Sequence, residues 1–253
     1  MKGAGIMQAN GVAIEFEGVY KQFDQSEVLK GMGLLVRWGE VTTILGPSGC
    51  GKSVTLKHII GIERADRGRV EVAGHDMNTI SKRDLTGLRK RMGVLFQSSA
   101  LFDSMTVKEN VAFGLRMHTH MSETEITERV EICLGAVKLE GSENTMPVEL
   151  SGGMQKRAAL ARAIAMSPDF ILYDEPTTGL DPSTANVVGE YIVKLQNELD
   201  VTSIVVTHDL SLANQISDSI ALLFEGRTAI QGSPEDVAKS GNEQYDMFVS
   251  GKI

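Results

Sequence analysis

The stretch Gly46-Pro47-Ser48-Gly49-Cys50-Gly51-Lys52-Ser53 decides the fold, because it has the pattern G-x-x-x-x-G-K-S. It follows the apolar, β-branched stretch Val41–Leu45 and precedes residues 52–60, which have the composition of a helix. A glycine loop in this context turns backbone N–H groups toward an anion, and the helix N-terminus adds partial positive charge. We therefore expect Lys52 to contact phosphates and Ser53 to bind Mg²⁺. The alternative is a Gly- and Ser-rich turn that matches by chance.

The composition favours one globular domain in a reducing compartment. The chain has 253 residues, and no linker rich in Pro, Gly or Ser divides it. No apolar run approaches the roughly 18 residues that a membrane span needs, and residues 1–10 lack the apolar block of a signal peptide. Cys50 and Cys133 make no disulfide framework. The formal net charge of −8 argues against a nucleic-acid partner.

Two aromatic residues near the N-terminus are candidates for contact with a nucleotide base. Residues 12–19 and 28–36 are expected to form antiparallel strands joined by a polar turn at 24–27. Tyr20 and Phe23 lie on or near that turn. Either ring could stack on a base, and the alternative for each is a half-buried strand aromatic without a ligand.

The middle of the chain is predicted to contain a helical insert at about residues 98–157. Gln97 follows a predicted strand at residues 92–96, and residues 106–117 and 122–134 have apolar residues at helical spacing. Before it we expect a strand at 69–74 and a helix around 81–91.

A second glycine motif, L-S-G-G-M at residues 150–154, begins a predicted helix that extends to Met166. Ser151 is the expected N-cap, and Gly152 and Gly153 leave backbone N–H groups unobstructed at the helix N-terminus. This is a candidate second anion-binding surface. Taken alone, S-G-G before a helix is more often only a cap.

A third group of polar residues follows two predicted strands. The strand at 170–175 ends in Asp174 and Glu175, and the strand at 201–207 is followed by His208. Because the carboxyl ends of parallel strands meet at one sheet edge, Asp174 is expected to face the Mg²⁺ of the phosphate loop and Glu175 the γ-phosphate. The alternatives are a strand that ends in solvated acids and a structural histidine. Residues 221–224 and 228–231 are expected to form a hairpin, and a last short helix is expected to begin at Ser233.

Six motifs in this order resemble the ATPase subunit of ATP-binding-cassette (ABC) transporters over residues 12–232: G-P-S-G-C-G-K-S, Gln97, L-S-G-G-M, Y-D-E-P, G-L-D-P and His208. The S-G-G motif distinguishes this family from other phosphate-loop ATPases. The resemblance implies an α/β fold: a P-loop NTPase (RecA-like) core with a mostly parallel sheet, an N-terminal antiparallel β subdomain and a helical insert carrying the signature motif. It implies one ABC ATPase domain at 12–232 and a short C-terminal helix or tail at 233–253.

The resemblance further implies ATP and Mg²⁺ as cofactors, with two subunits that dimerise head to tail. Each ATP would lie between the phosphate loop of one subunit and the S-G-G helix of the other. Glu175 would be the general base, and His208 would hold the γ-phosphate. The residues implied in catalysis are Lys52, Gln97, Glu175 and His208, and those implied in metal binding are Ser53, Gln97 and Asp174. Nucleotide binding is implied for Phe23, Gly46, Pro47, Ser48, Gly49, Cys50, Gly51, Lys52, Ser53, Val54, Ser151, Gly152, Gly153 and Asp181.

The resemblance gives individual roles to Phe23 and Asp181, and the sequence departs from the family at Val54. Phe23 is preferred to Tyr20 for adenine because its spacing to Lys52 is closer to that of the family's aromatic residue. Asp181 would communicate across the dimer. Val54 departs from the family, which usually has a hydroxyl residue there near the α-phosphate. The missing hydrogen bond is worth about 0.5–1.5 kcal/mol, so we expect nucleotide affinity to be several-fold lower.

Within this family, residues 95–111 and 150–164 resemble the Mce/Mla-type lipid-transport ATPases. Met154 stands where many importer ATPases have Gln. This implies a peripheral homodimer on the cytoplasmic face of the inner membrane, an integral-membrane permease and an Mce-type lipid-binding component. The substrate would be phospholipid or another hydrophobic molecule. The alternatives are the ATPase subunit of an amino-acid importer and a soluble ABC ATPase of cofactor assembly.

Overall fold

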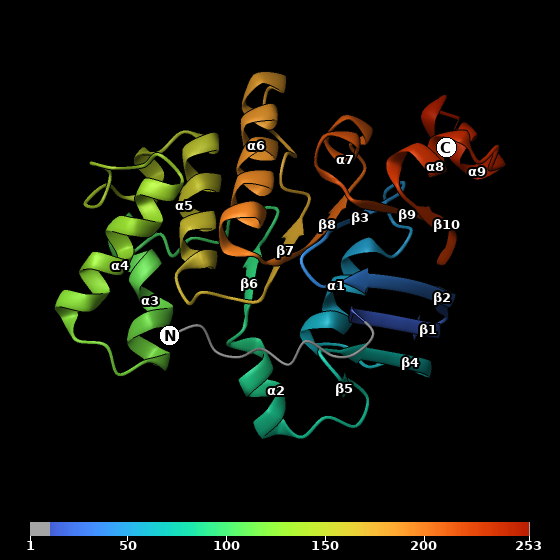
Figure 1. The fold of residues 1–253 in the computed structure, drawn as a ribbon, viewed down its shortest axis with the longest axis horizontal. Helices are drawn as coiled ribbons and strands as arrows, with labels where there is room; N and C mark the ends of the chain where they lie inside the picture. The colour runs from blue at the N-terminus through green and yellow to red at the C-terminus, as the bar shows by residue number, and fades with distance from the viewer. Residues whose placement is uncertain (1–10, 253) are drawn as a thin grey trace.

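The phosphate loop follows β3 (Val41–Leu45), an inner strand of a six-stranded sheet (Figure 1). The computed structural model describes residues 11–252, and the expectation about a signal peptide in residues 1–10 lies outside them. The other strands are β6 (Met92–Leu95), β7 (Phe170–Asp174), β8 (Thr202–Thr207), β9 (Ser219–Phe224) and β10 (Arg227–Gly232). In the order β10-β9-β3-β8-β7-β6, β10 is antiparallel to β9 and the other neighbours are parallel. The predicted mostly parallel core is confirmed.

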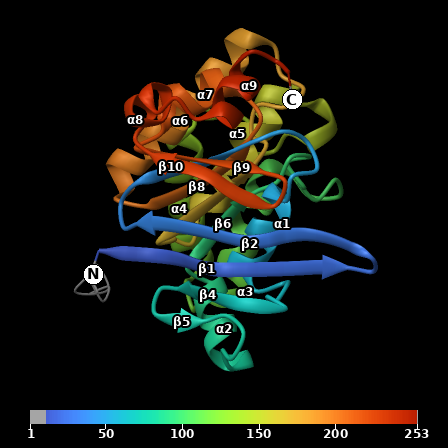
Figure 2. The ribbon, with the colours of Figure 1, turned by 90° about the vertical axis from the view of Figure 1, so that its right-hand side faces the viewer.

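A second, antiparallel sheet has the order β2-β1-β4-β5 (Figure 2). Its strands are β1 (Val12–Phe23), β2 (Ser26–Arg37), β4 (Arg67–Val72) and β5 (His75–Asp76). The predicted antiparallel subdomain is confirmed, but β1 and β2 are longer than expected. They pair as far as Phe23 and Ser26, so the turn is only Asp24-Gln25, with Asp24 in the left-handed region at φ 50°. A two-residue turn of this kind continues the strand pairing.

The helices are α1 (Lys52–Ile60), α2 (Lys82–Arg89), α3 (Val107–His118), α4 (Glu123–Ala136), the 3₁₀ helix η1 (Pro147–Glu149), α5 (Gly152–Ile164), α6 (Pro182–Leu199), α7 (Leu210–Ile216), α8 (Pro234–Lys239) and α9 (Glu243–Val249). α3, α4 and α5 lie together on the side of the molecule opposite the antiparallel sheet (Figure 1). Thr106 and Ser122 begin α3 and α4 with capping boxes. α5 is continuous through residue 157, the predicted end of the insert.

Alternate residues of the parallel strands face two hydrophobic cores. On β7, Ile171 and Tyr173 belong to the core shared with α3, α4, α5 and α6. Phe170 and Leu172 belong to the core shared with α1 and the antiparallel sheet. Covering on both faces explains why residues 170–173 of β7 are a continuous apolar run in the sequence. The parallel pairing of β8 with β3 and with β7 places the carboxyl ends of these strands along one edge.

The C-terminal region contains two short helices, α8 and α9, where one was expected. Ser233 caps α8 as predicted, and Asn242 caps α9. Tyr245 of α9 is 6% exposed and packs in a small core with Leu45 and Val237. Within residues 11–252, the helices are too short or too polar to cross a membrane.

Candidate functional site

The backbone of the phosphate loop approaches its neighbours closely. A Cβ atom added at Gly46 would lie 2.3 Å from the carbonyl oxygen of Leu223, and Gly51 has a φ of +111°. Glycine is therefore required at both positions. Lys52 is 6% exposed, and its Nζ donates to the carbonyl oxygens of Gly46 (2.8 Å) and Pro47 (3.0 Å). The ammonium group is thus held against the loop at the start of α1, where it can contact phosphate.

A pocket of about 550 Å³ lies beside this loop. The predicted site residues that line it are Ser48, Gly49, Gly51, Lys52, Ser53, Val54, Gln97, Glu175 and His208. Cys50 packs behind the loop in the core, where burial raises the pKa of its thiol. The fold therefore brings the loop together with the residues that follow β6, β7 and β8. The expected effect of Val54 on nucleotide affinity stays a prediction.

Two oxygen donors meet at the loop in a manner that suits a magnesium ion. Ser53 Oγ donates to Asp174 Oδ1 over 3.1 Å. Burial raises the pKa of Asp174, and the hydrogen bond from Ser53 opposes that rise. A hydroxyl and a carboxylate beside a phosphate-binding loop are the protein ligands that Mg²⁺ takes in such sites. The residues fit the metal that the sequence predicts.

Glu175 lies between the side chains of Lys52 and His208. Its Oε1 is 3.4 Å from Lys52 Nζ, and its Oε2 is 2.8 Å from His208 Nδ1. Glu175 has a φ of +48°, which a residue other than glycine rarely adopts, and its N–H donates to the carbonyl oxygen of Val206. This backbone conformation turns the carboxylate from the end of β7 back toward the phosphate loop. Lys52, Glu175 and His208 therefore converge on one part of the pocket beside the phosphate loop.

Two further residues line the pocket that the sequence did not indicate. Thr178 Oγ1 donates to Glu175 Oε2 over 3.3 Å, and Val28 of β2 packs against the loop at Gly51. Thr178 follows Glu175 by only three residues, and this short spacing could have indicated that the two side chains lie close together. Val28 had none, because its position depends on how the antiparallel sheet lies against the loop.

The candidate adenine-stacking residues lie outside this pocket's lining. Lys21 Nζ is 5.2 Å from the centre of the Phe23 ring, and Phe23 is 36% exposed. The Tyr20 ring instead contacts the guanidinium of Arg67, 4.1 Å away. Tyr20 is thus engaged in the antiparallel sheet, whereas Phe23 keeps an exposed face. Its stacking on adenine stays a prediction.

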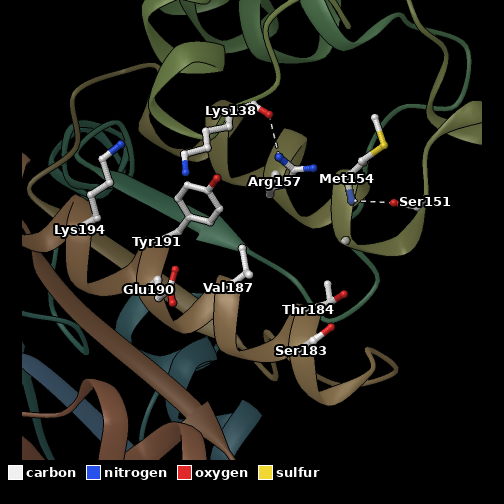
Figure 3. Close-up of a pocket in the computed structure, with 11 residues that line it drawn as sticks. Lys138, Ser151, Met154, Arg157, Ser183, Thr184, Val187, Glu190, Tyr191 and Lys194 are labelled. Atoms are coloured by element: carbon white, nitrogen blue, oxygen red, sulfur yellow. Dashed lines mark hydrogen bonds between the residues drawn. The ribbon is translucent and has the colours of Figure 1, made fainter.

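Part of the S-G-G motif lines a different cavity, a groove of about 590 Å³ between α5 and α6 (Figure 3), whose lining does not include Gly152. Ser151 caps α5, as its Oγ accepts from the Met154 N–H over 3.3 Å. Ser151 and Gly153 line this groove together with Thr184 of α6. Within one chain, the two candidate anion-binding surfaces are therefore lined by separate sets of residues.

Asp181 is the N-cap of α6, and two residues of the first turn of this helix, Ser183 and Thr184, line the groove. Its Oδ1 accepts from the backbone N–H groups of Ser183 and Thr184, both at 3.1 Å, and so caps α6. Hydrogen bonds from the hydroxyls of the same two residues hold the pKa of Asp181 well below its usual range. The carboxylate is thus ionised and fixed at the N-terminus of α6. Its role between subunits stays a prediction.

We expect Gly153→Ala to destabilise the protein by about 1–3 kcal/mol through overpacking. A Cβ atom at this position would lie 2.6 Å from Thr184 Cγ2, so either the Thr184 side chain would have to turn or α5 and α6 would have to separate. The measurement is chemical denaturation of the purified variant.

Gly152→Ala is the matched control, since its Cβ would meet Leu180 Cδ2 at an ordinary 3.6 Å. Adding Thr184→Ser to Gly153→Ala removes the clashing methyl group and keeps the hydroxyl that donates to Asp181. This double variant should recover most of the stability. Equal stability of the two glycine variants would contradict the predicted contact.

Comparison with known proteins identifies the family. The family described as ABC transporter matches residues 29–178. The chain is 40% identical over 242 residues to the "Probable ribonucleotide transport ATP-binding protein mkl" of Mycobacterium bovis, covering 96% of this chain and 67% of that protein. It is 42% identical over 221 residues to the "Intermembrane phospholipid transport system ATP-binding protein MlaF" of Haemophilus influenzae, covering 87% and 84%. A solved dimeric ATP-binding cassette, MJ0796 bound to ADP and Pi, superposes with a TM-score of 0.79 at 33% identity, covering 87% of this chain and 98% of that one. The chain therefore belongs to the ABC transporter family, as an ATP-hydrolysing ABC ATPase.

Proposed function

We propose that this chain powers the transport of phospholipid, or another hydrophobic molecule, across the cell envelope through a partner permease. The observation that carries the proposal is the 42% identity to the phospholipid-transport ATPase, which extends over 87% of this chain. The stretch around Met154, which resembles lipid-transport ATPases in its sequence, supports the same substrate class. Ribonucleotide transport, named for the mycobacterial relative, is the competing function.

In the proposed mechanism, each residue of the pocket has one task. Lys52 binds the β- and γ-phosphates, and Ser53 and Asp174 would hold Mg²⁺, which supplies neutralisation of phosphate charge. Glu175 accepts the proton of the attacking water, while His208 holds the γ-phosphate. The contacts of Glu175 with Lys52 (3.4 Å) and His208 (2.8 Å) support these roles, because all three groups then reach the same reacting atoms.

The proposed assembly is a head-to-tail homodimer bound to a permease, on the cytoplasmic face of the inner membrane, with an Mce-type lipid-binding component. The separate linings of the phosphate-loop pocket and the S-G-G groove support the dimer, since one chain alone supplies only half of each composite site. The superposition on a cassette solved as a dimer supports it as well.

An apolar groove of about 450 Å³ is the proposed docking site for a short cytoplasmic helix of the permease. Phe96, Phe102 and Phe113 line it with 42%, 42% and 37% of their surfaces exposed. The rings of Phe102 and Phe113 are in contact, with centroids 4.8 Å apart. Exposed aromatic residues that line a cavity are typical anchors for a partner helix. The groove begins next to Gln97, so docking and the nucleotide site are connected through one segment.

We expect Phe102→Asp to abolish transport and to weaken recovery of the ATPase with membranes, while the isolated protein still folds and binds ATP. Loss of a buried anchor costs about 2 kcal/mol or more of docking energy. The assays are thermal melting, nucleotide binding and co-purification with the permease.

Ile62→Asp is the control, because Ile62 is 58% exposed and lies outside the lining of the groove. It should co-purify as the unaltered protein does. Unfolding of Phe102→Asp, or its normal recovery with the permease, would show that Phe102 is a core residue or takes no part in docking.

The proposed function is tested by reconstituting the ATPase together with its partner permease in liposomes. ATP-dependent movement of a fluorescent phospholipid between these liposomes and an acceptor is expected, and Glu175→Gln should stop it. ATP-dependent uptake of ribonucleotide or amino acid with no phospholipid movement would reject the lipid assignment. An ATPase that stays active and never sediments with membranes would favour the soluble alternative.

A further inference from the structure

Two cationic side chains of α5 hold the backbone of the segment that follows β6. Lys156 Nζ donates to the carbonyl oxygens of Gln97 at 2.5 Å and Phe96 at 3.4 Å. Arg162 donates to the carbonyl oxygens of Ser99 at 2.9 Å and Ala100 at 2.6 Å. The segment 96–100 is thus fastened along most of its length to the helix whose N-terminus carries the S-G-G motif.

This segment does not have a conformation that its own residues favour. Ser99 and Ala100 are consecutive residues with φ values of +63° and +46°. Such angles are unfavourable for residues other than glycine and persist only where surrounding contacts impose them. The bonds from α5 are contacts of this kind, and they act on the stretch that begins at Gln97.

Lys156 is an unusual residue to find in this place. It is 5% exposed, and burial lowers the pKa of its ammonium group, while the charge of Asp174 raises it. A buried ammonium is costly unless acceptors surround it, and the acceptors here are the two carbonyls of the segment. Methionine or leucine would pack the same helix position without that cost. The positive charge of Lys156 is therefore best explained by its hydrogen bonds to the carbonyl oxygens of Phe96 and Gln97.

We propose that Lys156 is a positioning residue for Gln97, and that α5 links Gln97 of one ATP site to the S-G-G motif, which serves the other. The S-G-G motif occupies the first turn of α5, and Lys156 lies one turn further on. A displacement of the helix by the partner's nucleotide therefore moves the backbone of Gln97 directly. The inference rests on the proposed role of Gln97 at the γ-phosphate and metal.

The test compares Lys156→Met, which keeps the side-chain length and removes the donors, with Lys156→Arg, which keeps donors and charge. In the assembled transporter, Lys156→Met should lower kcat about tenfold to a hundredfold, as expected for loss of a charged hydrogen bond, with KM for ATP little changed. Lys156→Arg should restore most of the rate. The control is Arg89→Met, because Arg89 also donates to two carbonyls, those of Ile60 and Gly61, outside the pocket. It should leave kcat unchanged.

Combination with Gln97→Ala separates positioning from a merely structural role. If Lys156 acts through Gln97, the double variant hydrolyses ATP no more slowly than Gln97→Ala alone. Losses that multiply, or a Lys156→Met variant with unaltered kcat, would overturn the inference and leave the role of Gln97 intact. A Gln97→Ala variant with unaltered kcat would overturn both. Should Lys156→Met not fold, Lys156→Gln takes its place in the same comparison.

Discussion

Glu175→Gln is expected to lower the rate of ATP hydrolysis by about 10²–10⁴-fold while ATP still binds and the dimer persists. The amide has the shape of the carboxylate but cannot accept a proton from water. The change also removes the negative charge beside Lys52, 3.4 Å away, and His208, 2.8 Å away. The Lys52 ammonium should then hold the phosphates of ATP at least as firmly as before, so the variant should accumulate in its ATP-bound form.

Glu225→Gln is a close control for this experiment. Glu225 also follows a strand of the six-stranded sheet and has nearly the same φ, +47° against +48° for Glu175. It lies in the β9–β10 hairpin, outside the pocket lining. Phosphate release and bound nucleotide are measured for both variants in the assembled transporter. Near-normal turnover of well-folded Glu175→Gln would show that Glu175 is not the general base.

The core of the fold was predictable because its signals are local. β3, β7 and β8 are buried on both faces, so each is a short run of apolar and β-branched residues without the alternation of a half-exposed strand. The positions at which strands end were harder to predict from the sequence. β1 continues to Phe23 because it pairs with β2, and that pairing is a tertiary contact. The second C-terminal helix was missed for the same reason, since α9 is short and is stabilised by packing of Tyr245.

The convergence of Lys52, Glu175 and His208 was also predictable, since parallel strands bring their carboxyl ends to one sheet edge. Val28 and Lys156 could not be found in this way. In the sequence, Val28 has the features of an ordinary strand residue, and only the packing of the antiparallel sheet against the loop places it at the site. In the sequence, Lys156 has the features of an ordinary helix residue, and only the packing of α5 against the segment after β6 brings it to Gln97. Both residues make contacts with segments distant in the sequence, and such contacts leave no periodic pattern from which they could be predicted.

Head-to-tail assembly predicts that damage to the S-G-G motif of one subunit destroys the ATP site built on the other subunit's phosphate loop. Ser151→Arg places a long charged side chain at the N-terminus of α5, where the partner's nucleotide is expected, and Lys52→Ala removes the phosphate-binding ammonium. Ser81→Arg is the control for the lost N-cap, because Ser81 caps α2 through the Asp84 N–H at 3.1 Å. Loss of either cap costs about 0.5–2 kcal/mol.

The two lesions are combined in dimers purified through a different tag on each subunit. With Lys52→Ala on one chain and Ser151→Arg on the other, both changes fall in the same composite site, so the second site stays intact and should retain one ATP per dimer. With both changes on one chain opposite an unaltered chain, each site contains one lesion and neither should retain ATP. Placing Glu175→Gln on all chains prevents hydrolysis, so that retained nucleotide can be counted after gel filtration. If each chain instead formed its own complete site, the assignment would be reversed, because the unaltered chain would keep its ATP and the two single-lesion chains would both lose theirs.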